Sequence, residues 1–206
     1  MQTVIKAYEP NGAEVGVKAT LGGALYNAPP QVIWTAKGYG RQAMATAAVA
    51  ALVVRPTTVA MVTLFNNSTK NFVIERAFGH NLVGVANNSY GIWLCVHPVG
   101  MATPTNDITV RNKTNGGNAD TEGIFDIEAT VIDNGWFPWG KSGQTVTITT
   151  PGQQIEAEIS GRIILPPTAA ISLQVVATAT GTTMTCGFHW FAVPATELSL
   201  SQLNRN

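Results

Sequence analysis

From about residue 50 onward, short runs of β-branched and aromatic residues alternate with turn residues at intervals of roughly 8 to 15 residues, a pattern typical of all-β domains. Each run predicts a strand. The runs are VAMVTLFN, NFVIERAFGH, SYGIWLCVHP, ITVRN, GIFDIEATVID, TVTITTP, QIEAEISGRIIL, AAISLQVVATA and TMTCGFHWFAV. They predict an all-β, antiparallel β-sandwich, and nine strands come close to the number in a jelly roll. Strand count alone does not separate a jelly roll from another Greek-key sandwich.

Two of these runs show which side of the sheet their residues face. In QIEAEISGRIIL, Ile155, Ala157 and Ile159 alternate with glutamates, which predicts one buried and one wet face. The first two runs flank the polar stretch NNSTKN and are expected to form a hairpin. In the second of them, Phe72, Ile74 and Phe78 have one parity, whereas Val73, Glu75 and Ala77 have the other, so residues of one parity are expected to face the core.

The first forty-five residues are rich in Gly, Ala and Pro and show neither strand alternation nor a helical stripe. We therefore expect an extended N-terminal arm over residues 1–48, a jelly-roll sandwich over 49–195 and a short polar tail over 196–206. Tyr26, Trp34 and Tyr39 argue against complete disorder of the arm. Its aromatic residues either pack on their own domain, which the pattern favours, or reach a neighbouring subunit. The stretch ATAAVAALVV at the boundary is ambiguous between helix and strand, and its end favours a strand.

Length and charge narrow the possible functions. The 206 residues suit one domain, charged residues make up 12% of the chain, and Lys+Arg and Asp+Glu number 12 each. Because no run of like charge occurs, we expect neither nucleic acid nor a membrane surface as a partner. The start MQTVIKAYEPNGAEVG lacks the basic and apolar regions of a signal peptide, and the longest apolar run is too short to span a bilayer. Cys95 and Cys186 lie in apolar runs and are expected to be small buried hydrophobic residues.

The stretch GWFPWGKS matches the spacing of a phosphate-binding loop, with Gly135, Gly140, Lys141 and Ser142 at the motif positions. In such loops backbone amides surround the phosphates, and a helix starting at the Lys-Ser step points its N-terminus at the ligand. Here the following GQTVTITTPGQQ alternates like a strand, and Pro138 has no amide hydrogen to donate. A nucleotide site is therefore not expected.

Other catalytic or metal-binding patterns are weaker still. The carboxylates of Asp120, Glu122, Asp126 and Glu128 bracket one predicted strand, but their spacing matches no EF-hand loop, and a solvated strand edge explains them better. The three histidines are far apart, and no His or Cys pair has zinc-ligand spacing. No nucleophile motif is present. The sequence thus predicts no enzyme, catalytic residue, cofactor or metal ligand, although a metal site assembled only by the fold stays open.

The WFPWG stretch is expected to be a loop between strands, with either of two roles. Its aromatic residues Trp136, Phe137 and Trp139 form a hydrophobic plug over one end of the sandwich, or they form an exposed contact surface. As a contact surface, a subunit interface fits better than a sugar platform.

Three segments carry a family resemblance: LVVRPTTVAMVTLFNN, NFVIERAFGH and EAEISGRIILPPTAAISLQVVATATGTTMTCGFHWFAV. Together, over about residues 50–193, they resemble tailed-bacteriophage virion proteins of the small jelly-roll type. The shared pattern is a strand ending in a Gly-Arg step, a Pro-Pro turn, an alternating strand and a last strand with a tryptophan. Its positions here are Gly161, Arg162, Pro166, Pro167 and Trp190.

The resemblance implies a capsid cement, decoration or head-fibre protein, commonly a homotrimer, which binds the major capsid protein or other virion proteins. Such a protein belongs to the virion and is assembled in the host cytoplasm. We expect Trp34, Tyr39 and the loop containing Trp136, Phe137 and Trp139 to contact partners, and Phe188 and Trp190 to lie in the core or at a trimer axis. The alternative is a carbohydrate-binding β-sandwich module for host or glycan attachment.

Overall fold

The computed structural model describes most of the chain. The described residues are 6–8, 14–16, 29–48, 50–51, 55–83, 87–114, 117–127, 131, 135–144, 154–179 and 181–198. Their elements are β1 (Lys6–Tyr8), β2 (Glu14–Gly16), α1 (Pro30–Ala36), β3 (Gly40–Ala48), β4 (Ala50–Ala51), β5 (Val62–Phe65), β6 (Asn71–Val83), β7 (Ser89–His97), β8 (Val110–Asn112), β9 (Ala119–Asp120), β10 (Ile124–Ile127), β11 (Phe137–Gln144), β12 (Gln154–Leu165), β13 (Ala170–Ala177) and β14 (Thr183–Val193).

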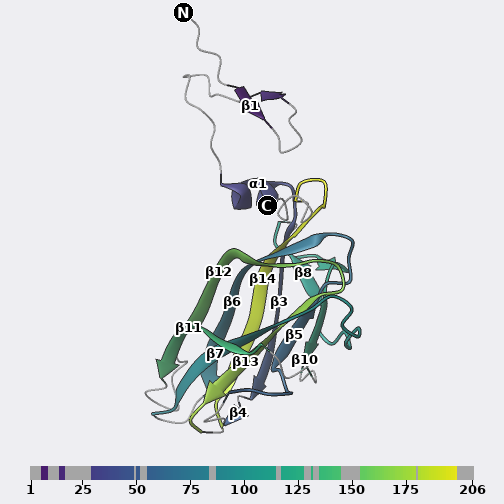
Figure 1. The fold of residues 1–206 in the computed structure, drawn as a ribbon. Coiled ribbons are helices and arrows are strands. Elements are labelled where there is room, and N and C mark those ends of the chain that lie inside the picture. Colours follow the sequence, from purple (N-terminus) through teal and green to yellow (C-terminus); the bar gives the residue numbers. More distant parts are fainter. Residues whose placement is uncertain are drawn as a thin grey trace, which may run out of the picture.

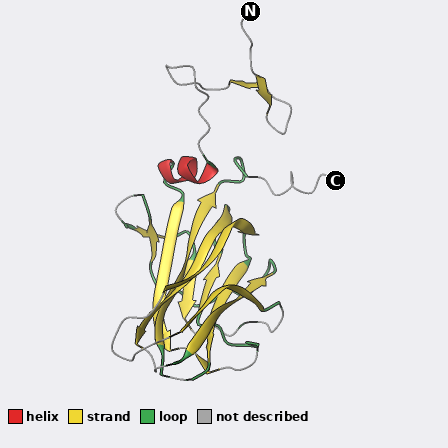
Figure 2. Ribbon diagram, turned by 90° about the vertical axis from the view of Figure 1, so that its left-hand side faces the viewer, coloured by secondary structure: helices red, strands yellow, loops and turns green. Residues whose placement is uncertain are grey.

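Two six-stranded sheets pack face to face, with α1 at one end (Figures 1 and 2). The β6 sheet has the order β12-β6-β14-β3-β8-β9. The β7 sheet has the order β10-β5-β13-β7-β11, and the two-residue β4 pairs in parallel with β13. All other pairings are antiparallel, so the predicted all-β antiparallel sandwich is confirmed. Strands β1 and β2 pair only with each other.

The strand order is that of a jelly roll. Eight strands pair from the outside of the sequence inward: β3 with β14, β5 with β13, β6 with β12, and β7 with β11. Successive pairs fall alternately in the two sheets, as they do when one long antiparallel ribbon is rolled up. The connection from β7 to β11 supplies the additional strands: β8 and β9 extend the β6 sheet beside β3, and β10 extends the β7 sheet beside β5.

Large apolar side chains from both sheets fill the interior. Trp190 and Phe188 on β14 are fully buried, and they lie against Phe72 and Phe125, with ring centroids 5.8 and 6.4 Å apart. Of the two positions expected for Phe188 and Trp190, the structure therefore selects the core. Cys95 and Cys186 are both buried, as predicted, and burial raises the pKa of Cys186 to about 12.

Strand β12 follows its predicted bounds and alternation, and the Gly-Arg step within it marks a bulge. Ile155, Ala157 and Ile159 are buried. The register to β6 shifts between Glu158 and Ile163, where Ser160 and Gly161 have positive φ values of 49° and 76°. Arg162 donates from Nη2 and Nε to the carbonyls of Glu158 and Ile159, at 2.7 and 3.0 Å. Its guanidinium thereby binds carbonyls that the bulge displaces from the ladder.

A second bulge, at Glu75 in β6, overturns the predicted parity of that strand. His189 of β14 pairs with Arg76, but the next residue, Trp190, pairs with Ile74, so Glu75 is skipped. Before the bulge, Phe72 and Ile74 face the core. Beyond the bulge the pattern is inverted: Ala77 is fully buried, whereas Phe78 points to the outside of the sheet. An extra residue in one strand shifts every later side chain to the opposite face.

The predicted hairpin between the first two runs is also wrong, because β5 and β6 lie in different sheets. The NNSTKN turn crosses from one sheet to the other. Asn66 is buried in this turn, and its Nδ2 donates to the carbonyls of Lys70 and Leu165, at 2.8 and 2.9 Å. Its Oδ1 accepts from the backbone N and Oγ of Ser68. Side-chain hydrogen bonds replace strand pairing here.

The expected boundary between arm and sandwich at residue 48 needs correction. Residues 40–48 form β3, which pairs with β14 on one side and β8 on the other, so the sandwich begins at Gly40. The WFPWG stretch is likewise not a loop, because residues from Phe137 onward form β11 at the edge of the β7 sheet. Pro138 is tolerated there, since an edge strand has one row of unpaired amides and a bulge follows it.

Some predictions lie outside the described residues. They are the strand TVTITTP at 145–151, positions 128–130 and 132–133 of GIFDIEATVID, most of the expected arm including Tyr26, and the tail beyond Leu198.

Gly187 in the middle of β14 allows β3 to approach closely. A Cβ at this position would lie 2.1 Å from the carbonyl oxygen of Ala43. We predict that Gly187→Ala lowers the free energy of unfolding by about 3 kcal/mol, measured by urea denaturation, because β3 and β14 would have to separate. Gly91→Ala is the control, since a Cβ there meets nothing within 4 Å. Equal losses in both variants would contradict this account of Gly187.

Candidate functional site

The two outer faces of the sandwich differ, because the described residues cover one of them and leave the other without such a cover. On the β7 sheet, Trp136 and Val131 pack over Cys95. Trp136 is 4% exposed, and its Nε1 donates to the carbonyl of Thr57 at 2.8 Å. The backbone N of Val131 donates to the carbonyl of Thr58 at 2.7 Å. For Trp136 the structure thus supports the plug alternative, although the plug lies on a face of the sandwich.

Beneath this covered face lies a Ser-His pair that resembles part of a catalytic site. His97 Nε2 lies 2.8 Å from Ser172 Oγ, which is also 2.8 Å from Thr63 Oγ1. All three side chains are buried, and burial lowers the pKa of His97. Because Ser172 has no exposed surface, a substrate has no access to its hydroxyl. Hydrogen bonds within the sheet account for this group.

The remaining aromatic residues of the WFPWG stretch lie at the edge of the sandwich. The rings of Phe137 and Trp139 are 5.2 Å apart, and both are partly buried against the main core. The guanidinium of Arg162 lies 5.4 Å from the Trp139 ring. Both residues keep some exposed surface, so a role in partner contact stays a prediction for them.

Trp34 and Tyr39, the other predicted contact residues, meet at the end of the sandwich that carries α1 (Figure 2). The Trp34 ring lies 5.6 Å from Phe191. Tyr39 donates its hydroxyl to Glu197 at 2.7 Å, and Lys37 pairs with the same carboxylate at 2.8 Å. Hydrogen bonds from Lys37 and Tyr39 lower the pKa of Glu197. Both aromatic residues therefore pack on their own domain, and contact with a neighbour stays a prediction.

The phosphate-loop motif has a backbone that does not fit a phosphate site. Residues Gly140 to Gln144 continue β11, so a strand occupies the position where the motif requires a helix to begin. Ser142 pairs with Gly91 across the bulge of β11. Three of the four motif positions, Gly140, Lys141 and Ser142, are therefore part of an edge strand, and Gly135 precedes it.

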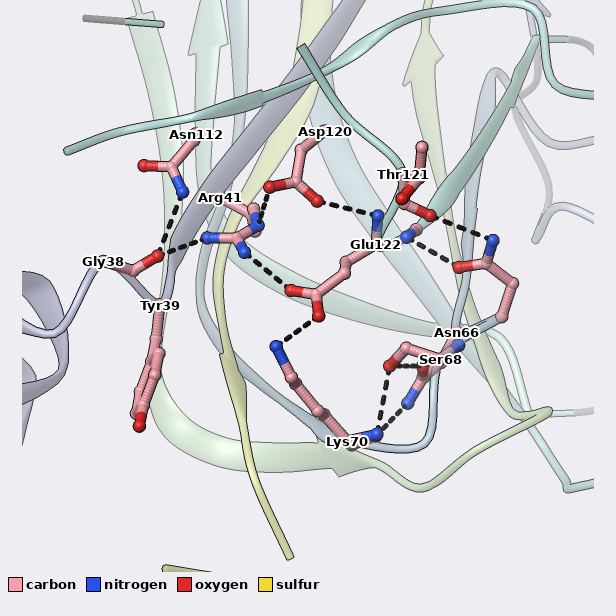
Figure 3. A network of polar contacts seen from close by, with 12 residues as sticks. Gly38, Tyr39, Arg41, Asn66, Ser68, Lys70, Asn112, Asp120, Thr121 and Glu122 are labelled. Carbon is pink, nitrogen blue, oxygen red and sulfur yellow. Dashed lines mark hydrogen bonds and ion pairs between the residues drawn. The ribbon is translucent and has the colours of Figure 1, made fainter. Parts of the chain in front are cut away.

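Two of the four acidic side chains considered as metal ligands, Asp120 and Glu122, bind cations of the chain instead (Figure 3). The buried Arg41 lies 3.0 Å from Asp120 through Nε and donates from Nη2 to Glu122 at 2.6 Å. Glu122 also pairs with Lys70. Arg41 Nη1 donates to the carbonyl of Gly38 at 2.6 Å. This network fastens the start of β3 to β9 and to the turn before β6.

Asp126, another candidate ligand, is buried in β10. Its Oδ2 accepts a hydrogen bond from the backbone N of Thr105 at 2.8 Å. Burial raises the pKa of Asp126. Glu128 lies outside the described residues. Within the described part of the chain, no three His, Cys, Asp or Glu side chains gather as a metal site would require.

The outer face of the β6 sheet is the candidate functional site, and we call it the open face. Strands β12, β6, β14 and β3 lie side by side in this sheet (Figure 1). Their register forms three parallel rows of outward-pointing residues. The first polar row is Glu158, Arg76, His189, Gln42 and, on β8, Arg111. The middle row is Glu156, Phe78, Gly187 and Met44. The second polar row is Gln154, His80, Thr185 and Thr46.

The open face is hollowed around His189. One hollow of about 620 Å³ extends from His189 to Gln31, and another of about 500 Å³ extends to Ile108 beside β8. A third, of about 290 Å³, extends to His80. Phe78 and Met44 line both of the smaller hollows. Between these two residues lies Gly187 of β14, against which the β3 backbone packs closely.

His189 is held as a neutral hydrogen-bond acceptor. Arg76 Nε donates to His189 Nδ1 at 3.0 Å, and Lys113 Nζ is 3.5 Å from the same atom. Burial, followed by the charges of Lys113 and Arg76, lowers the pKa of His189 to about 3. Arg76 also pairs with Glu156 at 2.7 Å, and Lys113 pairs with Glu75 at 3.1 Å. The arrangement suits binding better than acid-base chemistry at neutral pH, because its histidine does not titrate there.

Reasoning from the sequence did not identify the open face. Its rows combine one residue from each of four or five strands, and the bulge at Glu75 breaks the single parity that was predicted for β6. The alternation of Glu156 and Glu158 with buried residues was the one signal of an exposed face.

Comparisons with known proteins add little to this picture. No protein-family model matches the chain, and no curated protein matches it. Among solved structures, the chain is similar to "D431N Mutant VP2 Protein of Infectious Bursal Disease Virus; Derived T=1 Particles" at 11% identity, with a TM-score of 0.14. The match covers 77% of this chain and 42% of that protein. A TM-score this low carries no argument about function. In the described residues, no helix has the length and hydropathy needed to cross a membrane.

The Arg41 network should contribute strongly to stability. We predict that Glu122→Gln lowers the free energy of unfolding by about 2 kcal/mol, because a buried guanidinium loses one of its two carboxylates. Glu197→Gln, which weakens the exposed pair with Lys37, should cost much less, since water screens that pair. Thermal unfolding of the two variants and the parent measures the difference. A larger loss for Glu197→Gln would contradict the assignment.

His189 should destabilise the protein in acid. The pKa of His189 in the folded state lies below its ordinary value of 6.5, so the unfolded chain takes up a proton that the folded chain does not. Stability from this residue is therefore complete above pH 6.5 and is lost as the pH falls toward 3. We predict that His189→Gln reduces the loss of stability between pH 7 and pH 4, measured by urea denaturation. An NMR titration showing His189 protonated at pH 6 would contradict this prediction.

Proposed function

We propose that this chain is a non-enzymatic structural protein of a bacteriophage virion, a capsid cement or decoration protein that binds across adjacent capsid subunits and stabilises the shell. One observation carries the proposal: the molecule combines a jelly roll, an architecture used in viral capsids, with a buried Ser-His pair that a substrate cannot reach. The proposed function therefore depends on the rigid shape and the exposed surface of the molecule, and not on catalysis. The family resemblance of residues 50–193 adds the assignment to tailed phages.

The end of the sandwich with α1 is the proposed attachment surface, and its occupant is a capsid subunit. Val32 and Ile33 on α1 are 53% and 39% exposed, which is unusual for paired aliphatic side chains. The neighbouring Trp34 packs on Phe191 and fixes the helix against the sandwich. Trp34 and Tyr39 would then contribute their exposed edges to the contact.

Stabilisation would arise from linkage between binding and assembly. A protein that binds only the assembled shell lowers the free energy of that state in proportion to the logarithm of its concentration over Kd. The chain has equal numbers of basic and acidic residues, 12 of each, so little net repulsion opposes dense packing of copies on a shell or association as a homotrimer. No reaction is needed.

We predict a stable trimer in size-exclusion chromatography with light scattering. We also predict that adding the protein raises the melting temperature of purified capsids from a tailed phage that encodes the chain.

Val32→Asp combined with Ile33→Asp should weaken capsid binding at least about tenfold, a loss of about 1.4 kcal/mol, because two apolar contacts become charged. Val99→Asp is the control, since Val99 is 61% exposed, more than either Val32 or Ile33, but lies in the loop after β7.

A chain that stays monomeric at all concentrations and leaves the melting temperature of the capsids unchanged would overturn the proposal. Full capsid binding by the Val32→Asp and Ile33→Asp variant would overturn the choice of attachment surface.

A further inference from the structure

The geometry of the open face points to a second role, the binding of a neutral saccharide across β6, β14 and β3. We propose that one or two sugar rings lie over Gly187, between Phe78 and Met44, with their hydroxyl groups reaching the polar rows on either side. This inference does not depend on the virion assignment, because it concerns a different surface of the molecule from α1.

The middle row supplies the apolar contact that a sugar ring requires. Phe78 offers an aromatic side chain, and Met44, which is 56% exposed, offers a flexible thioether. The His189 ring lies edge-on to Phe78 at 5.3 Å and 74°, and the Arg76 guanidinium lies 5.9 Å from its centroid. These neighbours fix Phe78 in place. The C–H groups of a pyranose could then lie between Phe78 and Met44, which line both of the smaller hollows.

The polar rows supply hydrogen-bond partners on both sides of this apolar strip. Alternate outward residues of a strand are about 6.7 Å apart, so the two polar rows flank the strip at a separation of about 13 Å. Gln42 and Arg111 stand in one row, and Gln154, His80 and Thr185 in the other. Amide, imidazole and hydroxyl groups both donate and accept, as sugar hydroxyls do.

The charges of the open face favour a neutral ligand over an acidic one. Arg76 is paired with Glu156 at 2.7 Å, and Lys113 with Glu75 at 3.1 Å. An anion would have to displace these carboxylates or lie beside them. A neutral polyhydroxylated ligand can instead hydrogen-bond to the paired groups without breaking them.

The hollows have the size and the support that a small-ligand site needs. The two that share Phe78, Met44 and His189 measure about 500 and 290 Å³, which falls near the range of small-ligand sites. Most of their lining residues lie on paired strands, whose positions are fixed by the sheet register, and residues 107–109 before β8 complete the larger one. Little ordering is therefore required on binding.

The test begins with the purified full chain on an array of neutral and acidic oligosaccharides. It continues with saturation-transfer NMR, using the strongest-binding neutral oligosaccharide of the array as the probe. We expect binding to neutral glycans that changes little between 50 and 500 mM salt. Phe78→Leu, Met44→Ala and Gln42→Ala should each weaken binding by about threefold to tenfold, equivalent to roughly 0.6 to 1.4 kcal/mol.

Val83→Ala is the control, because Val83 is an exposed apolar residue at the end of β6 that lines none of the three hollows. Met44 and Gln42 have exposed surface, so Met44→Ala and Gln42→Ala are expected to fold. These two variants therefore test the site even if Phe78→Leu fails to fold. Absence of binding to every printed glycan would overturn the inference. So would salt-sensitive binding to acidic glycans alone, or loss of capsid binding in Met44→Ala, which would make the open face a protein contact.

Discussion

The pairing of β3 with β14 is the contact on which the rest of the structure depends, because it joins the first long strand of the sandwich to the last. The ladder runs without interruption from Ala48 opposite Thr183 to Gly40 opposite Phe191. It closes the roll, places β8 and β9 at the edge of the β6 sheet, and sets Gly187 against the β3 backbone. Pairing two strands so far apart in the sequence costs conformational entropy, because a very long loop must close. Burial of side chains and the Arg41 network at the end of the ladder must offset this cost.

The bulge at Glu75 determines how β6 divides its side chains between core and surface. Before the bulge, Phe72 and Ile74 fill the core, and beyond it the inward position falls to the small Ala77. Ala77 is opposite Phe188, which is large enough to occupy that part of the interior alone. Phe78 and Arg76 are consequently released to the outside. One inserted residue thus supplies the open face with its aromatic side chain and its central cation.

Strands in which large apolar residues alternate with polar ones, or follow one another in a long run, were predicted from the sequence. Strands without such a pattern were missed. Residues Ile155, Ala157 and Ile159 between glutamates gave β12 its bounds, and the last run, TMTCGFHWFAV, gave those of β14. Strand β3 was assigned to the arm because its buried residues, Ala43 and Ala45, are small and its first residue is Gly40. Strand β11 was assigned to a loop because Pro138 and Gly140 are turn residues, and their tolerance at a sheet edge depends on a neighbour that the sequence does not name.

The open face could not have been read from the sequence for a different reason. Each of its rows takes one residue from each strand, so membership is set by register between segments more than a hundred residues apart, such as Gln42 and His189. Register in turn depends on two bulges whose positions follow from tertiary packing. The same register makes the face selective. Because its central cations are already paired with glutamates, a partner gains little from charge alone and must match the spacing of the rows.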